Sequence, residues 1–298
     1  MKILLFGGKG QLGLEISKRG QDLNFEIVSP VSSEIDISDR DQVLFLTEKV
    51  KPSLVINAAA YTAVDKAEDE VDKAFLINRD GAGYVAEAAK NNNARLFHVS
   101  TDYVFDGTGS TPLTEDSPTK PLSVYGQSKL EGEQAVFKAF GSKALVIRIS
   151  SLHGQYGNNF IHTMLRLFSE RDQIKVVSDQ RMSPTWAGWL AEVMLDLSRI
   201  KSQGILHACS KGETTWYELA SATFEIAAPF IKGAENTKID PIPASDYPTP
   251  AKRPMYSVLD CSKLTGLLGR ESMDWREGLS LHLKELGYPP DEFGKRDN

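Results

Sequence analysis

The sequence has few of the residues that build disulfide frameworks or metal clusters. It contains only two cysteines, Cys209 and Cys261, and their spacing matches neither kind of site. No apolar run is long enough to cross a bilayer, and the first strand-like stretch, Ile3 to Phe6, is too short for a signal peptide. We therefore expect a cytoplasmic protein with buried thiols and no membrane partner.

Basic charge is not in excess either. Lys and Arg number 34 against 40 Asp and Glu, which gives a net charge of −6. A nucleic acid or an anionic membrane would need a basic surface, so neither is expected as a partner. Any anionic ligand must instead be held by local donors. The 298 residues, 41% of them apolar, are enough for one large or two modest domains with a sizeable core.

What the sequence does have is a glycine-rich turn after its first strand. Gly7 would make the tight turn, Gly10 would let the backbone approach a diphosphate, and Gly13 would allow close packing of the helix that follows. The alternative is a tight turn that binds nothing, but its place between a strand and a helix favours a nucleotide. The expected cofactor contacts here are Gly7, Gly10, Gln11, Leu12 and Gly13.

The second strand lacks the acidic residue that usually holds an adenosine ribose. It ends at Pro30, and serines at 29, 32 and 33 could accept a 2′-phosphate instead, while Glu34 is a late candidate for the ribose. Asp36 and Ile37 could contact adenine, or they could precede the N-terminus of a helix that starts near Asp39. The cofactor is therefore expected to be NADPH or NADH.

A third strand, residues 54–57, runs into small residues. Ala58, Ala59 and Ala60 suit a place where the backbone passes close to a cofactor. One long helix is expected over residues 69–91, and Asn78 is the polar residue on its apolar face. A buried amide must be hydrogen-bonded, so Asn78 either ties neighbouring backbone or supports the region of Tyr125.

The pair Tyr125 and Lys129 carries the candidate chemistry. Residues four apart share one face of a helix, and a cation beside a phenol favours the phenolate, which would bring its pKa toward the working range. Such a pair also arises by chance as a solvated lysine over a half-buried ring. Hydroxyl groups in residues 100–107, directly after a fourth strand, make the catalytic interpretation stronger.

The alternation of strands and helices predicts an α/β fold, a Rossmann-like doubly wound parallel sheet. The sheet domain should cover residues 1–150 and be joined by 185–210, while residues 151–298 form mainly a smaller C-terminal substrate-binding lobe. The candidates named so far follow the strands at their carboxyl ends, where such folds bind ligands. Farther along, Arg253 ends a proline-rich segment and could hold a phosphate or be a surface charge.

Together these residues resemble the extended short-chain dehydrogenase/reductase family and, within it, the dTDP-4-dehydrorhamnose reductases. The similarity extends over essentially the whole chain. It lies in the glycine turn from Gly7 to Gly13, Asp36-Ile37, residues 57–65 (Asn-Ala-Ala-Ala-Tyr-Thr-Ala-Val-Asp), residues 100–107 (Ser-Thr-Asp-Tyr-Val-Phe-Asp-Gly), Tyr125 with Lys129, residues 157–160 (Gly-Asn-Asn-Phe), Pro184-Thr185 and residues 247–254 (Tyr-Pro-Thr-Pro-Ala-Lys-Arg-Pro).

The resemblance implies a reductase of a nucleotide-linked 4-keto sugar that uses NADPH or NADH. Thr101, Tyr125 and Lys129 would be catalytic, and the last two would also contact the cofactor. Members of this family can require Mg²⁺ or form homodimers, and no residue set here decides the metal or the choice between monomer and homodimer. The implied substrate contacts are Thr62, Val64, Thr101, Asp102, Tyr103, Ser151, Asn159 and Arg253.

One departure and two alternatives accompany this resemblance. Ser151 stands where the family usually has a tryptophan that would face the sugar, and His153 and Tyr156 are the nearest residues in sequence that could fill the gap. A 4,6-dehydratase or epimerase is one rival, although Tyr103 occupies the place of the dehydratase glutamate. The other rival is a non-catalytic subunit similar to the regulatory subunit of methionine adenosyltransferase.

Overall fold

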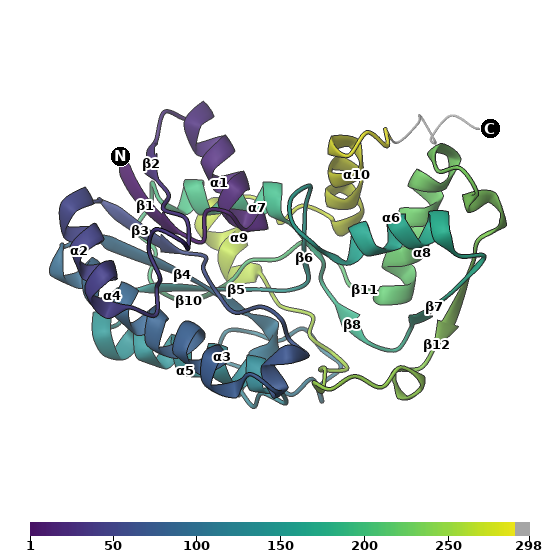
Figure 1. Cartoon of the computed structure of the whole chain (residues 1–298), viewed down its shortest axis with the longest axis horizontal. Coiled ribbons are helices and arrows are strands. Elements are labelled where there is room, and N and C mark those ends of the chain that lie inside the picture. The colour runs from purple at the N-terminus through teal and green to yellow at the C-terminus, as the bar shows by residue number, and fades with distance from the viewer. Residues whose placement is uncertain (290–298) are drawn as a thin grey trace.

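The computed structural model describes residues 1–289, and its centre is a six-stranded sheet with strand order β10-β5-β4-β3-β1-β2 (Figure 1). All neighbouring strands in it are parallel. Strands β3 and β5 are buried along their whole length and consist almost entirely of apolar residues, because helices cover both faces of the sheet. This confirms the predicted Rossmann-like class. The strands are β1 (Lys2–Phe6), β2 (Glu26–Val28), β3 (Leu54–Asn57), β4 (Arg95–Thr101), β5 (Leu145–Ile149) and β10 (Gly204–His207).

Two helical layers bury these faces. One face of the sheet packs against α1 (Gln11–Asp22), α7 (Ala187–Leu197) and α9 (Ser262–Leu268), and the opposite face packs against α2 (Arg40–Val50), α4 (Ala82–Asn91) and α5 (Val124–Phe140) (Figure 1). The carboxyl ends of the strands are left free between the layers. These ends therefore face the second lobe (Figure 1).

The predicted continuous helix over residues 69–91 is wrong in detail. A short helix, α3 (Val71–Phe75), is followed by a π-helical segment (Leu76–Gly81) and only then by α4. Close packing against α5 accompanies the change, since a Cβ on Gly132 of α5 would lie only 2.1 Å from the carbonyl oxygen of Asn78. A π-helical turn of this kind is often found beside a functional site.

The second lobe lies beside the carboxyl ends of the strands (Figure 1). Thr185 lies in a short strand (Thr185–Trp186), and α7 begins only at Ala187. No helix within residues 1–289 combines the length and the apolar character needed to span a membrane. The remaining elements are β6 (Leu152–His153), α6 (Phe160–Glu170), β7 (Gln173–Val177), β8 (Arg181–Met182), β9 (Thr185–Trp186), β11 (Thr214–Thr215), α8 (Trp216–Ala227), β12 (Lys238–Ile242), α10 (Trp275–Glu285) and the 3₁₀ turns Lys66–Glu68, Asp102–Val104, Ala228–Phe230, Ala234–Asn236 and Ala244–Asp246.

Candidate active site

One cavity of about 750 Å³ lies at the carboxyl ends of the strands and extends between the two lobes. It gathers almost every residue that the sequence singled out. Of the predicted contacts, only Asn159 and Arg253 are absent from its lining. The predicted residues that do line it are Gly7, Gly10, Gln11, Leu12, Gly13, Asp36, Ile37, Ala58, Ala59, Ala60, Thr62, Val64, Thr101, Asp102, Tyr103, Tyr125, Lys129 and Ser151.

The glycine turn forms the floor of one end of the cavity. Gly7 has φ +86°, and a Cβ there would lie 2.5 Å from the carbonyl carbon of Ala58, so only glycine fits. Gly10 is the N-cap of α1 and provides no side-chain cap, which leaves N–H groups of the first helical turn without a side-chain acceptor. Backbone donors at a helix N-terminus suit the diphosphate of a dinucleotide.

The end of β2 contributes the next part of the wall. Pro30, Val31 and Ser32 line the cavity, as does Asp36. Glu34 does not, because its carboxylate accepts a hydrogen bond from the Val31 N–H over 3.1 Å. A side chain engaged by its own turn is a poor candidate for the ribose, so this part of the sequence hypothesis is not supported.

Tyr125 begins the catalytic face of α5. Ser123 caps this helix by accepting a hydrogen bond from the Gly126 N–H. Tyr125 is buried, and it lines the cavity together with Thr101. Burial raises the pKa of Tyr125 to about 12, and a hydrogen bond with Thr101 offsets only part of that shift. The expected lowering of the pKa is therefore wrong for this structure, since desolvation by burial is the largest effect on this phenol. Tyr125 is a protonated phenol at neutral pH, as a proton donor must be.

Lys129 lies one turn farther along the same helix and is only 2% exposed. Its Nζ donates a hydrogen bond to the carbonyl oxygen of Val99 over 2.7 Å. Burial lowers the pKa of Lys129 to about 8, although the carboxylate of Glu133 acts in the opposite direction. Glu133 itself is held by Arg148 at 2.7 Å. The Arg148–Glu133 ion pair is itself buried, so the carboxylate that acts on Lys129 is fixed in position.

Asp102 is a buried carboxyl group in the wall, held by several hydroxyl groups. It accepts hydrogen bonds from the hydroxyls of Thr101 (3.0 Å) and Ser150 (2.8 Å), and Ser257 also bonds to it. Burial raises its pKa. Because these bonds use the carboxylate oxygens, Asp102 fixes the orientation of Thr101 at the end of β4.

The two predicted contacts outside the lining have other partners. Asn159 caps α6 and donates to the side chain of Gln11 over 2.9 Å, so it joins the second lobe to the glycine turn. Arg253 forms a two-pronged ion pair with Asp65, with Nη to Oδ distances of 3.1 and 2.8 Å. Its charge is therefore already paired, and the structure does not support a phosphate contact at this residue.

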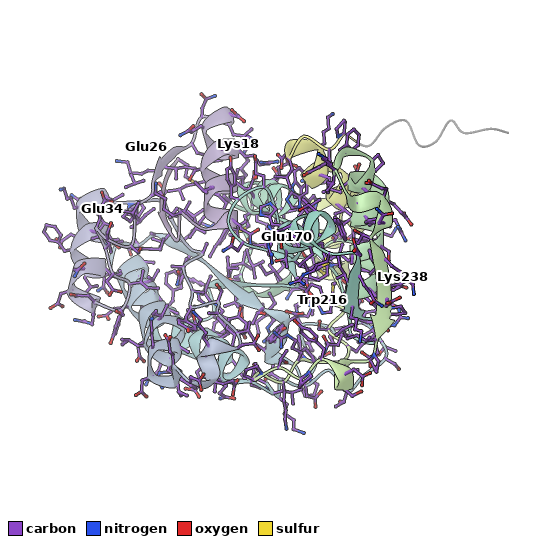
Figure 2. The ribbon with its side chains drawn as sticks, turned by 45° about the vertical axis from the view of Figure 1, so that its right-hand side comes forward. Lys18, Glu26, Glu34, Glu170, Trp216 and Lys238 are labelled. Carbon is purple, nitrogen blue, oxygen red and sulfur yellow. The ribbon has the colours of Figure 1, made fainter. Side chains whose placement is uncertain are left out.

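Sequence reasoning missed the aromatic wall of the cavity. Phe160 of α6 and Trp216 of α8 both line it, with their ring centroids 4.8 Å apart; Trp216 is labelled in Figure 2. Ser151 is on the same lining and has a left-handed backbone, φ +44°. Neither residue proposed to fill the gap beside Ser151 lines the cavity. His153 instead packs against His282, with 3.0 Å between their Nδ1 atoms.

The family is decided by comparison with known proteins. Residues 1–288 match the family model described as RmlD substrate binding domain. The chain belongs to the dTDP-4-dehydrorhamnose reductase family. A dTDP-4-dehydrorhamnose reductase from Aggregatibacter actinomycetemcomitans is 40% identical over 286 residues, which cover 93% of this chain and 97% of that protein.

Solved structures of this reductase family have the same fold. A dTDP-4-dehydrorhamnose reductase from Clostridium acetobutylicum superimposes with a TM-score of 0.90 at 38% identity, over 96% of this chain and all of that one (100%). The enzyme from Bacillus anthracis, solved in complex with NADP, gives a TM-score of 0.89 at 34% identity, over 95% and 99% of the two chains.

Proposed function

We propose that this chain reduces the C4 keto group of dTDP-4-dehydro-β-L-rhamnose to dTDP-L-rhamnose with NADPH or NADH, in nucleotide-sugar biosynthesis for surface polysaccharide. Family membership supports the reaction class. The observation that carries the proposal is one continuous cavity whose lining includes both the glycine turn and the group Thr101, Tyr125 and Lys129. Cofactor and sugar can therefore meet at those three side chains.

The residues present fit a nicotinamide dinucleotide. The glycine turn offers backbone donors and no room for side chains, and Ala58 to Ala60 continue the same wall. When bound, the reduced nicotinamide supplies a hydride for a carbonyl carbon. Asp36 and Ile37 would hold the adenine end, and Lys129 would hold the nicotinamide ribose.

Tyr125 would then supply the proton that the sugar oxygen needs. Its raised pKa keeps the phenol protonated until negative charge develops on the C4 oxygen. Thr101 would donate a hydrogen bond to the same oxygen by turning its hydroxyl hydrogen away from Asp102, to which it donates in this structure. The Lys129 ammonium would stabilise the phenolate that forms when the proton leaves.

We further propose that NADPH is used at least as well as NADH. Ser32 lines the cavity at the end of β2, and no acidic side chain at residues 30–32 would repel a 2′-phosphate. The proposal does not include Mg²⁺ as a cofactor, because residues 1–289 contain no group of three or more His, Cys, Asp or Glu side chains arranged to hold a metal ion. A cytoplasmic location remains our expectation. A monomer or a homodimer could each work, since one chain lines the whole described cavity.

Ser151 favours one second candidate, a reductase of another nucleotide-linked 4-keto-6-deoxy sugar. A serine buries far less area than the tryptophan usual in the family, so this part of the cavity can accept a bulkier or more polar sugar. Tyr103, which lines the cavity in place of a dehydratase glutamate, argues against elimination.

The test is to mix the enzyme with NADPH and a panel of nucleotide-linked 4-keto sugars, and to follow cofactor fluorescence and products. The proposal predicts stoichiometric NADPH consumption and dTDP-L-rhamnose as product. Highest kcat/KM for another keto sugar would select the second candidate. Cofactor that stays tightly bound and unchanged overall would indicate an epimerase, and binding without turnover would indicate a regulatory subunit.

A further inference from the structure

The two cysteines, 52 positions apart in sequence, come together outside the active site. Cys209 follows strand β10, and Cys261 immediately precedes helix α9. Their Sγ atoms are 3.4 Å apart. A disulfide needs about 2.05 Å, so the sulfurs would have to approach by only about 1.4 Å. The fold thus holds the two sulfurs in contact with each other.

The two thiols differ in their access to solvent. Cys209 is fully buried (0% exposed) among Val104, Phe105 and Leu259. Cys261 is half-buried and lines a second cavity of about 420 Å³, whose lining shares no residue with the active-site cavity. A small reagent can therefore reach Cys261 first, without entering the active site.

The thiols also differ in acidity. The contact with the Cys209 sulfur lowers the pKa of Cys261, and the Cys209 N–H, which donates to the Cys261 sulfur over 3.3 Å, acts in the same direction, while burial opposes both. The pKa of Cys209 is raised by the same thiol contact and by burial. A thiolate is the reactive form of cysteine, so the accessible member of the pair is also the more nucleophilic one.

We propose that Cys209 and Cys261 are a peroxide-reactive pair that forms a reversible disulfide, an oxidation site distinct from the reductase site. The Cys261 thiolate attacks one oxygen of hydrogen peroxide, the O–O bond breaks, and a sulfenic acid forms while the other oxygen leaves as hydroxide and takes up a proton. The Cys209 sulfur then attacks the Cys261 sulfur, gives up its proton, and the sulfenic oxygen leaves as water. Overall, two thiols are oxidised and one peroxide is reduced to two waters.

The disulfide would join two parts of the fold that are far apart in sequence. The segment before Cys261 crosses from the second lobe and forms a bridge to Leu113 through Leu259. Oxidation would fix this segment to the end of β10. Because neither cysteine lines the active-site cavity, we expect the oxidised protein to keep its kcat/KM and to melt at a higher temperature.

The test uses the full-length protein and hydrogen peroxide, with intact-mass spectrometry and thermal melting. We expect the loss of two hydrogens, a higher Tm, and reversal of both by dithiothreitol. Cys209→Ser should stop at a Cys261 sulfenic acid that dimedone traps, whereas Cys261→Ser should leave the buried thiol unreacted.

Three results would overturn the inference. These are two thiols that survive peroxide in the wild-type protein, a disulfide found only between molecules, and equal reactivity of the two serine variants. Unchanged melting temperatures of the reduced variants would show that they are folded. The readouts are mass and Tm, so the outcome does not depend on the proposed reductase activity.

Discussion

Lys129 Nζ donates a hydrogen bond to the carbonyl oxygen of Val99 over 2.7 Å, which ties helix α5 to strand β4. The bond holds the ammonium group in the cavity wall rather than in solvent. Both partners line the active-site cavity. The position of this charge is therefore set by the fold before any ligand binds.

The first prediction is a fall in kcat/KM at alkaline pH. Burial lowers the pKa of Lys129 to about 8, so its positive charge is lost as the pH rises through that value. Tyr125, with a pKa of about 12, stays protonated across the same range and cannot cause the fall. The pH profile should therefore decline above about pH 8. Lys129→Arg, which keeps its charge, should be less active but should lack this decline. A wild-type profile that stays flat would contradict the assignment.

Asn78 is predicted to stabilise the fold behind Tyr125. Its side chain accepts from the Tyr61 N–H at 2.8 Å and donates to the Ser128 hydroxyl at 2.9 Å, and that hydroxyl donates to the Tyr125 carbonyl at 2.8 Å. Asn78→Ala leaves these buried groups unpaired and should lower the free energy of unfolding by about 1–3 kcal/mol in urea titrations. The control Asn92→Ala removes a half-buried hydrogen bond from the Asn92 side chain to the Ala88 carbonyl oxygen. It should lower the free energy of unfolding by less than about 0.5 kcal/mol. Equal decreases in the free energy of unfolding for the two variants would contradict the prediction.

Strand and helix patterns in the sequence were enough to predict the sheet and most of the residues that line the cavity. The apolar strands and the glycine turn are local signals, and the carboxyl ends of parallel strands meet at one edge. Asn78 shows where local signals fail. Its place on an apolar face indicated a buried amide, but the π-helical turn around it depends on close packing against Gly132, which is distant in sequence.

Residues of the second lobe were harder to place for the same reason. Trp216 looks like an ordinary core residue at the start of a helix, and only the approach of the two lobes brings it to the cavity. From the sequence, Arg253 could hold a phosphate or be a surface charge, and it is Asp65, far away in sequence, that pairs with it. The pKa of Tyr125 was misjudged because burial cannot be read from a spacing of four residues.

Trp216 is predicted to form part of the sugar site. Trp216→Ala should lower kcat/KM for the keto sugar by roughly 10- to 200-fold, the usual worth of an apolar pocket contact. Trp216→Phe should lose less, because a ring would still pack on Phe160. Tyr217→Ala is the matched control, since Tyr217 is the next residue of α8 and packs in the core without lining the cavity. If Tyr217→Ala lowers kcat/KM as much as Trp216→Ala, the effect is one of stability and not of sugar binding.

Ser32 is predicted to decide cofactor preference. Ser32→Glu would set a negative charge in the cavity wall where a 2′-phosphate is expected, and should lower kcat/KM for NADPH relative to NADH by at least about tenfold, or about 1.4 kcal/mol. Ser33→Glu adds the same charge at an exposed residue outside the lining and should change the ratio little. A strong preference of the wild-type enzyme for NADH would contradict the prediction.

Tyr125→Phe gives the most direct measurement of the central claim, that Tyr125 donates the proton during reduction of the keto sugar. The variant should keep the affinity for NADPH, measured by cofactor fluorescence, because the phenyl ring still fills the buried site beside Tyr103. Its kcat with dTDP-4-dehydro-β-L-rhamnose should fall by roughly two to four orders of magnitude, the contribution of a positioned general acid. Turnover close to that of the wild-type enzyme would contradict the account.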